Sequence, residues 1–465
     1  MEIHVSLGRR GRWSHDVYAQ LRAMMLDGRL RSGDALPATR ALAVRLNVSR
    51  NTVMSAYERL IAEGFLEAKA GAGTFVREMA PIATRHASPG ALKPIARWRS
   101  INASPRAAAT FDFRPGVPDP SLFPWDAWRR LIAKQWRGRQ PPRGYGAPEG
   151  ELVLRAAIAR HVGTSRAVRA EAGDVIVTAG AQQAFDLIAR VLVEPGAMVA
   201  VEEPGYPPAR HAFAAHGARV ALCAVDGEGL VVDALPDDAR VVYVTPSHQF
   251  PLGMPMSLTR RLALCAWAQR HRAAIVEDDY DSELRYEGRP LEPLHTLDRN
   301  GRVIYVGTFS KILAPSLRLG YAIAPASLLP ALAAARSIAD SHGPIEAERA
   351  LAALIDDGSL ARHVRRALRV YRERREYLIE ALKSIDALEV VPSGAGLHVA
   401  ALFRDARRDA DAFVARAREH GVAVASLSGY HAARARPGLA LGFGLIAAER
   451  IDQGVDRLKK ALSRL

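Results

Sequence analysis

From residue 111 onward, short apolar runs with the composition of buried strands alternate with alanine-rich helical segments. The runs are nearly continuous in Val, Ile and Ala, as is typical of parallel strands covered on both faces. The best examples are DVIVTAG, MVAVEEP, RVVYVTPS, AAIVEDDY and RVIYVGT. The alternation predicts an α/β domain with a largely parallel sheet over residues 111–465.

Every one of these runs ends in polar or turn residues. In open parallel sheets, ligands bind beyond the carboxyl ends of the strands. We therefore expect five loops to converge on one ligand. These loops begin near Thr178, Glu202, Thr245, Asp278 and Thr308.

Two of the loops have the groups that bind phosphate. Free N–H groups at the start of a helix attract an anion, and hydroxyl and guanidinium groups add further donors. The first loop contains Gly180, Ala181 and Gln182, and the second contains Thr308, Ser310 and Arg318.

Other residues of these loops match the reactive part of a cofactor. Lys311 supplies an amine that could form a Schiff base. Strand alternation places Asp278 and Tyr280 on one face, where a carboxylate would keep a pyridine nitrogen protonated and a phenol would hold the ring hydroxyl. Tyr206 could stack on the ring. Each residue alone has a simpler explanation, such as a surface lysine, but the whole set in this order predicts pyridoxal 5′-phosphate.

With these residues in view, residues 111–465 resemble the fold-type I aminotransferases, that is, an α/β PLP-dependent transferase-like fold. The resemblance implies that Lys311 is the Schiff-base lysine, that Asp278 pairs with the pyridinium and that the neighbouring Asp279 faces away. Tyr145, in RGYGAPEGELVLR, resembles the tyrosine that reaches the phosphate of the partner subunit. The resemblance therefore implies a head-to-tail homodimer with a shared site.

The N-terminal segment has a different pattern. Three helical patterns, in SHDVYAQLRAMMLDGRL, LPATRALAVRLN and NVSRNTVMSAYERLIAEG, precede a strand, a Gly-rich turn and a second strand in GFLEAKAGAGTFV. This order predicts a mainly α winged helix-turn-helix whose recognition helix begins with Ser49, Arg50, Asn51 and Thr52. Residues 1–110 contain 17 Lys and Arg against 8 Asp and Glu, and so hold +9 of the net charge of +15. A polyanion partner is one explanation and a solvated basic surface is the other.

This segment resembles the DNA-binding domain of the GntR family of bacterial transcription regulators over residues 14–77. The resemblance implies double-stranded DNA as partner. Met54 stands where some members carry arginine, so the base preference can differ. With the helix start, the expected DNA contacts are Arg40, Ser49, Arg50, Asn51, Thr52, Lys69, Gly71 and Gly73.

We predict three parts: a winged helix-turn-helix over 1–78, a basic linker over 79–110 and the aminotransferase-like domain over 111–465. The linker has five basic residues, no acid and no sustained period. This layout resembles the MocR subfamily of GntR regulators, to which FRPGVPDPSLFPWDAWRR and SHQFPLGMPMS are also similar. The chain has two cysteines, no signal-peptide pattern and no long apolar run. We therefore expect a cytoplasmic protein without a membrane span. We also expect no metal site.

Three positions depart from the aminotransferase pattern. Phe250 stands where an asparagine touches the cofactor hydroxyl, and His248 is either its partial replacement or a plain loop histidine. Ala440 stands where an arginine grips the substrate carboxylate, so that Arg434 or Arg436 would have to substitute. GABA-responsive members have an arginine two residues after the stacking tyrosine, but this chain has Pro208 there and Arg210 further on.

These departures favour a transcription regulator that senses pyridoxal 5′-phosphate itself, or an amine or amino acid, through an aldimine at Lys311. We expect no more than partial transamination. The alternatives are an active aminotransferase with a DNA-binding appendage, and a DNA-binding protein whose large domain is only a dimerisation scaffold.

Overall fold

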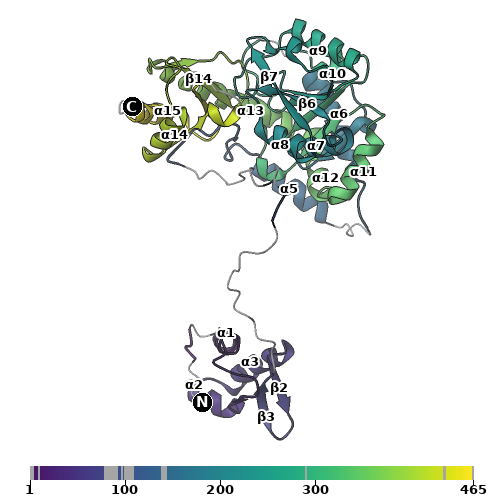
Figure 1. The fold of residues 1–465 in the computed structure, drawn as a ribbon. Helices are drawn as coiled ribbons and strands as arrows, with labels where there is room; N and C mark the ends of the chain where they lie inside the picture. The colour runs from purple at the N-terminus through teal and green to yellow at the C-terminus, as the bar shows by residue number, and fades with distance from the viewer. Residues whose placement is uncertain are drawn as a thin grey trace. The chain divides into compact units, whose positions relative to one another are not determined.

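The computed structural model describes residues 5–8, 11–77, 93–95, 98, 109–137, 144–288, 291–432 and 436–462. The chain forms two compact units, Met1–Pro94 and Ile95–Leu465 (Figure 1). Each unit is described by itself.

The first unit packs three helices against a small antiparallel sheet of order β1-β3-β2. Its core consists of apolar residues at helical spacing, including Val17, Leu21, Val53 and Leu60, which are fully buried. The β2–β3 hairpin pairs Lys69 with Gly73 next to its turn and forms the wing. The elements are α1 (Trp13–Leu26), β1 (Ala35–Leu36), α2 (Thr39–Leu46), α3 (Arg50–Ala62), β2 (Leu66–Lys69) and β3 (Gly73–Val76).

An eight-stranded sheet of order β5-β12-β11-β10-β9-β6-β7-β8 forms the centre of the second unit. Its strands pair in parallel, except that β12 is antiparallel to both neighbours and β8 is antiparallel to β7. The prediction of a largely parallel α/β sheet is confirmed. The strands are β5 (Val175–Thr178), β6 (Met198–Glu203), β7 (Arg219–Asp226), β8 (Gly229–Leu230), β9 (Ala239–Val244), β10 (Ala274–Asp279), β11 (Val303–Thr308) and β12 (Gly320–Ile323).

Helices cover both faces of this sheet, because successive apolar residues of each strand point to opposite sides. One face packs against α7 (Ala181–Leu192), α8 (Pro207–Ala215) and α11 (Leu329–Asp340). The other face packs against α5 (Trp125–Trp136), α6 (Leu152–Arg166), α9 (Leu258–His271), α10 (Leu294–Leu297), α12 (Ile345–Asp356) and α13 (Ser359–Lys383).

A smaller antiparallel sheet of order β13-β14-β17-β16 follows near the C-terminus. Short 3-10 turns lie at Ala172–Asp174, Val232–Ala234, Pro315–Leu317, Leu427–Tyr430 and Ala448–Arg450. No helix of the described residues is long and apolar enough to cross a membrane. The remaining elements are β4 (Phe111–Asp112), β13 (Leu388–Val390), β14 (His398–Phe403), α14 (Ala410–Glu419), β15 (Val422–Ala423), β16 (Ala425–Ser426), β17 (Gly438–Gly442) and α15 (Ile451–Leu462).

Candidate functional site

The two loops expected to bind phosphate lie against each other. A Cβ on Gly180 would come within 3.1 Å of both terminal nitrogens of Arg318, and a Cβ on Gly320 would lie 2.8 Å from the Gly180 Cα. Arg318 also donates a hydrogen bond to the Ala179 carbonyl. The contact exists because β12, which Gly320 begins, pairs with β5, which ends at Thr178. A guanidinium fork and the start of α7 therefore lie next to each other.

The start of α7 has no side-chain cap. Its N-cap is Gly180, with φ of 79°, so that no side chain caps the helix. Ala181 and Gln182 are the first helical residues, and the Gln182 side chain donates to the Pro208 carbonyl at 3.0 Å. Uncapped N–H groups together with the helix dipole favour an anion here.

The hydroxyls of the second loop lie close together. Thr308 Oγ1 and Ser310 Oγ are 3.1 Å apart, and the Ser310 N–H donates to Thr308 Oγ1 at 3.2 Å. Both side chains are buried.

Lys311 is half-buried and its amine donates to the Gly116 carbonyl at 2.8 Å. Burial lowers the pKa of this amine, although the carboxylates of Asp281 and Asp278 oppose the effect. A lysine with a lowered pKa holds more of its amine in the neutral, nucleophilic form.

Asp278 has one oxygen in use and one free. Its Oδ2 accepts the Tyr243 hydroxyl at 2.6 Å, whereas its Oδ1 is buried without a hydrogen-bond partner among the described residues. Burial raises the pKa of Asp278 to about 7. A buried acceptor without a donor is costly and calls for an explanation. A ligand that brings an N–H group to this oxygen fits the site, as the pyridinium of pyridoxal 5′-phosphate would.

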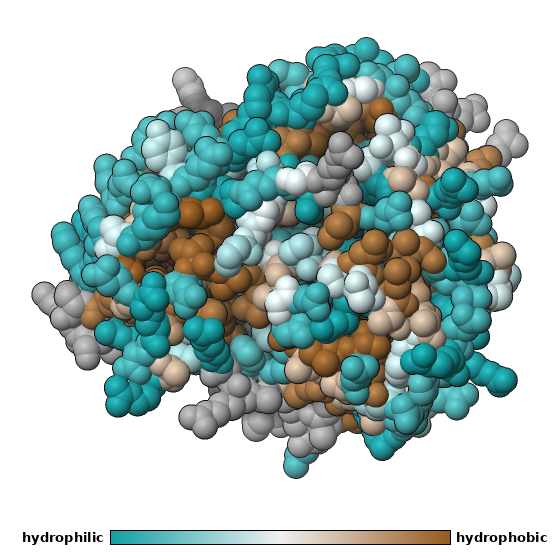
Figure 2. Space-filling view, turned by 90° about the horizontal axis from the view of Figure 1, so that it is seen from above, coloured by the Kyte–Doolittle hydropathy of each residue, from teal (hydrophilic) through white to brown (hydrophobic). Residues whose placement is uncertain are grey.

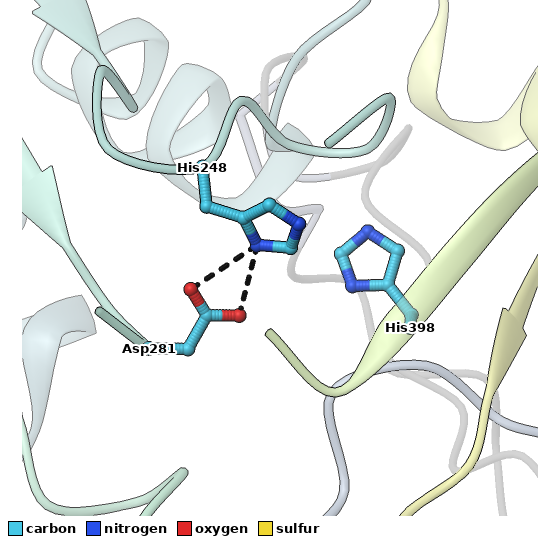
Figure 3. A group of neighbouring side chains, drawn as sticks. All are labelled: His248, Asp281 and His398. Carbon is cyan, nitrogen blue, oxygen red and sulfur yellow. Dashed lines mark hydrogen bonds and ion pairs between the residues drawn. The ribbon is translucent and has the colours of Figure 1, made fainter. Parts of the chain in front are cut away.

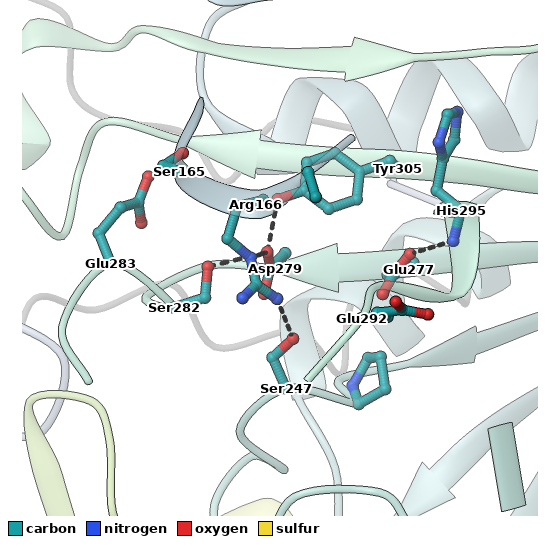
Figure 4. A network of polar contacts seen from close by, with 12 residues as sticks. Ser165, Arg166, Ser247, Glu277, Asp279, Ser282, Glu283, Glu292, His295 and Tyr305 are labelled. Atoms are coloured by element: carbon teal, nitrogen blue, oxygen red, sulfur yellow. Dashed lines mark hydrogen bonds and ion pairs between the residues drawn. The ribbon is translucent and has the colours of Figure 1, made fainter. Parts of the chain in front are cut away.

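Asp279 contacts other groups (Figure 4). It accepts hydrogen bonds from Arg166 Nε and from the Ser282 hydroxyl, each at 2.8 Å, and from the Tyr305 hydroxyl. Burial alone would raise the pKa of Asp279, but these partners outweigh it and the pKa is lowered. Asp279 is therefore a charged structural group with a lowered pKa, whereas the pKa of its neighbour Asp278 is raised.

Tyr280 and His248 belong to a buried polar cluster, of which Figure 3 draws His248, Asp281 and His398. His248 Nδ1 lies 2.9 Å from the Tyr280 hydroxyl and 3.1 Å from Asp281 Oδ2. Donor atoms of His248, Asp281 and His398 lie within 4.8 Å of one another, a spacing that could hold a metal ion. The expectation of no metal site stays a prediction.

Tyr206 and Phe250 lie in a group of aromatic rings. The Tyr206 ring meets the Phe250 ring edge-on, with centroids 5.4 Å apart, and burial raises the pKa of Tyr206 to about 12. Phe250 also packs against the rings of Tyr280, His398 and Tyr430. Where aminotransferases have an amide, this chain has an apolar side chain.

The candidate carboxylate-binding arginines of the described residues lie next to acids. Arg436 is exposed, 3.5 Å from Glu389, and Arg210 is 4.0 Å from Glu203. Arg434 lies outside the described residues. Tyr145 is 88% exposed and contacts the ring of His342, so it is free to meet another molecule.

The predicted DNA contacts lie on the surface of the first unit. Ser49 caps α3, with its hydroxyl accepting the Thr52 N–H at 3.1 Å. Thr52 is half-buried, and Lys69 pairs with Glu67 at 2.7 Å. The exposed ones are Arg40, Ser49, Arg50, Asn51, Lys69, Gly71 and Gly73.

The sequence reasoning missed Tyr243, Asp281 and His398 as parts of the site. Tyr243 differs from its neighbours in an apolar run only by its hydroxyl group. Asp281 is the residue that directly follows the AIVEDDY motif. His398 lies more than 100 residues from either, on β14, and only the fold brings it to them.

Two families match the chain: bacterial regulatory proteins of the gntR family over residues 14–76, and aminotransferase class I and II over residues 119–457. The probable rhizopine catabolism regulatory protein MocR of Rhizobium meliloti is 36% identical, over 97% of this chain and 93% of its own length. The pyridoxine biosynthesis transcriptional regulator PdxR of Corynebacterium glutamicum is also 36% identical, over 91% and 90%. The transcriptional regulator TauR of Rhodobacter capsulatus is 35% identical, over 98% and 97%.

Solved aminotransferases share the fold of the second unit. A kynurenine aminotransferase of Pyrococcus horikoshii, in complex with PMP, is 27% identical with a TM-score of 0.73, and the match covers 79% of this chain and 96% of that one. LysN of Thermus thermophilus, an alpha-aminoadipate aminotransferase complexed with N-(5′-phosphopyridoxyl)-L-leucine, is 30% identical with a TM-score of 0.70, over 76% and 92%. These comparisons confirm the predicted pairing of a winged helix-turn-helix with an aminotransferase-like domain.

Proposed function

Because this chain belongs to the GntR family of HTH-type transcriptional regulators and carries an aminotransferase class I and II domain, we propose that pyridoxal 5′-phosphate is its ligand, bound through Lys311. Asp278 carries the proposal. Its Oδ1 is buried and has no hydrogen-bond partner in the part of the chain that the structure describes, and the pyridinium of this cofactor would supply an N–H donor.

The other residues have complementary roles. Arg318, Thr308, Ser310 and the N–H groups at the start of α7 would hold the phosphate. The cofactor supplies an aldehyde to which amines attach reversibly. Lys311 offers an amine with a lowered pKa for that attachment, and Tyr206 would lie against the ring. An amine or amino acid effector would compete with Lys311 for the same carbon.

We propose that the ligand acts by linkage between the two units. A ligand changes DNA binding only if it binds one arrangement of the protein more tightly than another. The exposed residues at the start of α3 and on the wing would contact base edges and phosphates.

We also propose a homodimer in which Tyr145 reaches the partner subunit's phosphate. Figure 2 shows apolar patches bordered by polar side chains on one face of the molecule. Such patches are typical of surfaces that are covered in an assembly. The large exposed apolar side chains of the second unit include Trp125, Trp136, Leu152, Val153 and Ile338.

The visible absorption spectrum of the full chain with pyridoxal 5′-phosphate tests the proposal, together with borohydride trapping and mass measurement. Lys311→Ala should abolish the trapped adduct and leave the fold intact, because the lysine does not belong to the hydrophobic core. Lys383→Ala, an exposed lysine paired with Glu380, is the matched control and should keep the adduct. A trapped adduct in Lys311→Ala would contradict the assignment.

Aminotransferase activity is the second candidate, favoured by the shared fold. Ala440 and Phe250 stand where aminotransferases have their arginine and asparagine, which argues against it. Steady product formation from an amino donor and a keto acceptor would establish this alternative.

A further inference from the structure

His248 Nε2 faces a serine hydroxyl. Nε2 lies 2.9 Å from the Ser393 hydroxyl oxygen. The single hydroxyl proton of Ser393 can be donated either to Nε2 or to the Ala395 carbonyl, which lies 3.2 Å away. Nε2 can therefore accept from the serine, and the ring proton is left for Nδ1.

The second ring nitrogen faces a carboxylate. Nδ1 lies 3.2 Å and 3.1 Å from the two oxygens of Asp281, and both side chains are almost fully buried. Two bare lone pairs at this distance would repel each other in a dry interior, so that a proton must lie between Nδ1 and Asp281.

His398 fits the same arrangement. Its Nε2 lies 3.0 Å from the Pro251 carbonyl, which can only accept, so Nε2 is the donor. Burial lowers the pKa of His398 to about 3, so the ring is neutral and its Nδ1 is bare. Figure 3 shows this ring beside the His248–Asp281 pair.

A protonated Nδ1 decides how Tyr280 can act. The Tyr280 hydroxyl oxygen lies 2.9 Å from Nδ1, and so it accepts from the same N–H group that donates to Asp281. The phenol proton is then free for another acceptor. Because Phe250 has no amide, Tyr280 is a donor suited to the ring hydroxyl of the cofactor.

We propose that His248, with its proton on Nδ1 and paired with Asp281, is a positioning residue that holds Tyr280 as the hydrogen-bond donor to the cofactor's ring oxygen. The inference rests on the proposed cofactor. It assigns to a histidine–aspartate pair the support that an asparagine amide gives in aminotransferases.

The backbone around the pair is shaped to hold it. A Cβ on Gly396, whose φ is 83°, would lie 2.1 Å from His248 Cε1 and 2.6 Å from Asp281 Oδ2. A Cβ on Gly253, whose φ is 93°, would lie 2.7 Å from the Ser393 Cβ. Neither position admits a side chain while the pair stays in place.

The pH dependence of the bound cofactor's visible band measures this support. A donor to the ring oxygen stabilises the form of the cofactor that has lost its proton, so the loss of the donor raises the pH midpoint of the change. The ionisable and hydroxyl groups around His248 that could also contribute are Asp278, Tyr280, Asp281, Lys311, Ser393 and His398.

His248→Leu should raise the midpoint by about one pH unit. His248→Asn keeps an N–H donor near the position of Nδ1 and should stay close to the parent. Tyr280→Phe should raise the midpoint by as much as His248→Leu, and the double variant by no more, because the histidine acts through the tyrosine. His161→Leu is the matched control: it removes a partly buried histidine that pairs with Glu283 and should leave the midpoint unchanged.

The outcomes separate this inference from the proposed function. If the parent traps no cofactor, the proposed function is wrong. If His248→Leu traps the cofactor with the midpoint of the parent, or if its shift adds to that of Tyr280→Phe, the positioning role is wrong. If His248→Leu does not fold, the pH midpoints of His248→Asn and Tyr280→Phe are compared instead. A midpoint shift in His248→Asn as large as that in Tyr280→Phe would overturn the proposal.

Discussion

Replacing Asp279 and replacing Asp278 should have different consequences, although the two acids are adjacent in the sequence. Asp279 pairs with Arg166 inside the protein, and its side chain is fully buried. Asp279→Ala would leave the Arg166 guanidinium buried beside the hydroxyls of Ser247 and Tyr305, without its carboxylate partner. The removal of one member of a buried ion pair costs about 3–5 kcal/mol. We expect a loss of this size in the free energy of unfolding of the cofactor-free protein.

Asp278→Asn is the matched comparison. The Tyr243 hydroxyl can still donate to the amide oxygen, and a carboxyl with a raised pKa is replaced by a group that never ionises. At about pH 6 the free energy of unfolding should change by less than about 1 kcal/mol. Covalent attachment of pyridoxal 5′-phosphate should weaken, because the pyridinium loses its carboxylate.

Urea unfolding of the full chain, followed by tryptophan fluorescence, measures both variants. Trp267 is a suitable reporter because it is buried under the central sheet. Arg166→Met combined with Asp279→Leu should recover much of the loss, because it removes both charges together. If Asp279→Ala costs no more than Asp278→Asn, the separation of the two acids into structural and ligand-binding roles is wrong.

Two further predictions concern DNA binding and pH. Arg50→Ala should weaken binding to the operator by about 1–3 kcal/mol and leave cofactor attachment unchanged, as fluorescence anisotropy and trapping would measure; unaltered operator affinity would remove Arg50 from the contacts. The folded-state pKa of Asp278 is raised to about 7, so that between about pH 4 and about pH 7 the folded chain keeps a proton that the unfolded chain has lost. The free energy of unfolding of the parent therefore falls as the pH rises through this window. The free energy of unfolding of Asp278→Asn minus that of the parent should rise by on the order of 1 kcal/mol per pH unit over this window. Urea titrations of the cofactor-free proteins measure this difference, and a difference that does not change with pH would contradict the raised pKa.

The sequence was sufficient where local patterns decide the structure. Continuous apolar runs predicted the parallel strands, and the polar residues that end them predicted where Asp278 and Lys311 lie. Ser49 predicted the start of α3, because a serine N-cap acts on the helix that follows it directly.

The sequence was insufficient where partners come from distant parts of the chain. Asp279 is paired with Arg166, 113 residues earlier at the end of α6. His398, at the start of β14, lies beside His248 in the loop after β9, with ring centroids 5.1 Å apart. The antiparallel β12, which places Arg318 against Gly180, has no signature of its own in the sequence. Such contacts depend on strand order, which the period of a sequence does not encode.

The Asp278 oxygen that lacks a partner among the described residues would also make the stability of the folded protein depend on its ligand. A ligand that satisfies this oxygen binds the folded state and not the unfolded one, and at one hundred times its dissociation constant it adds about 2.7 kcal/mol to the free energy of unfolding. That amount lowers the unfolded fraction about a hundredfold. Proteases act on the unfolded fraction, so the number of regulator molecules in a cell would itself follow the concentration of the ligand.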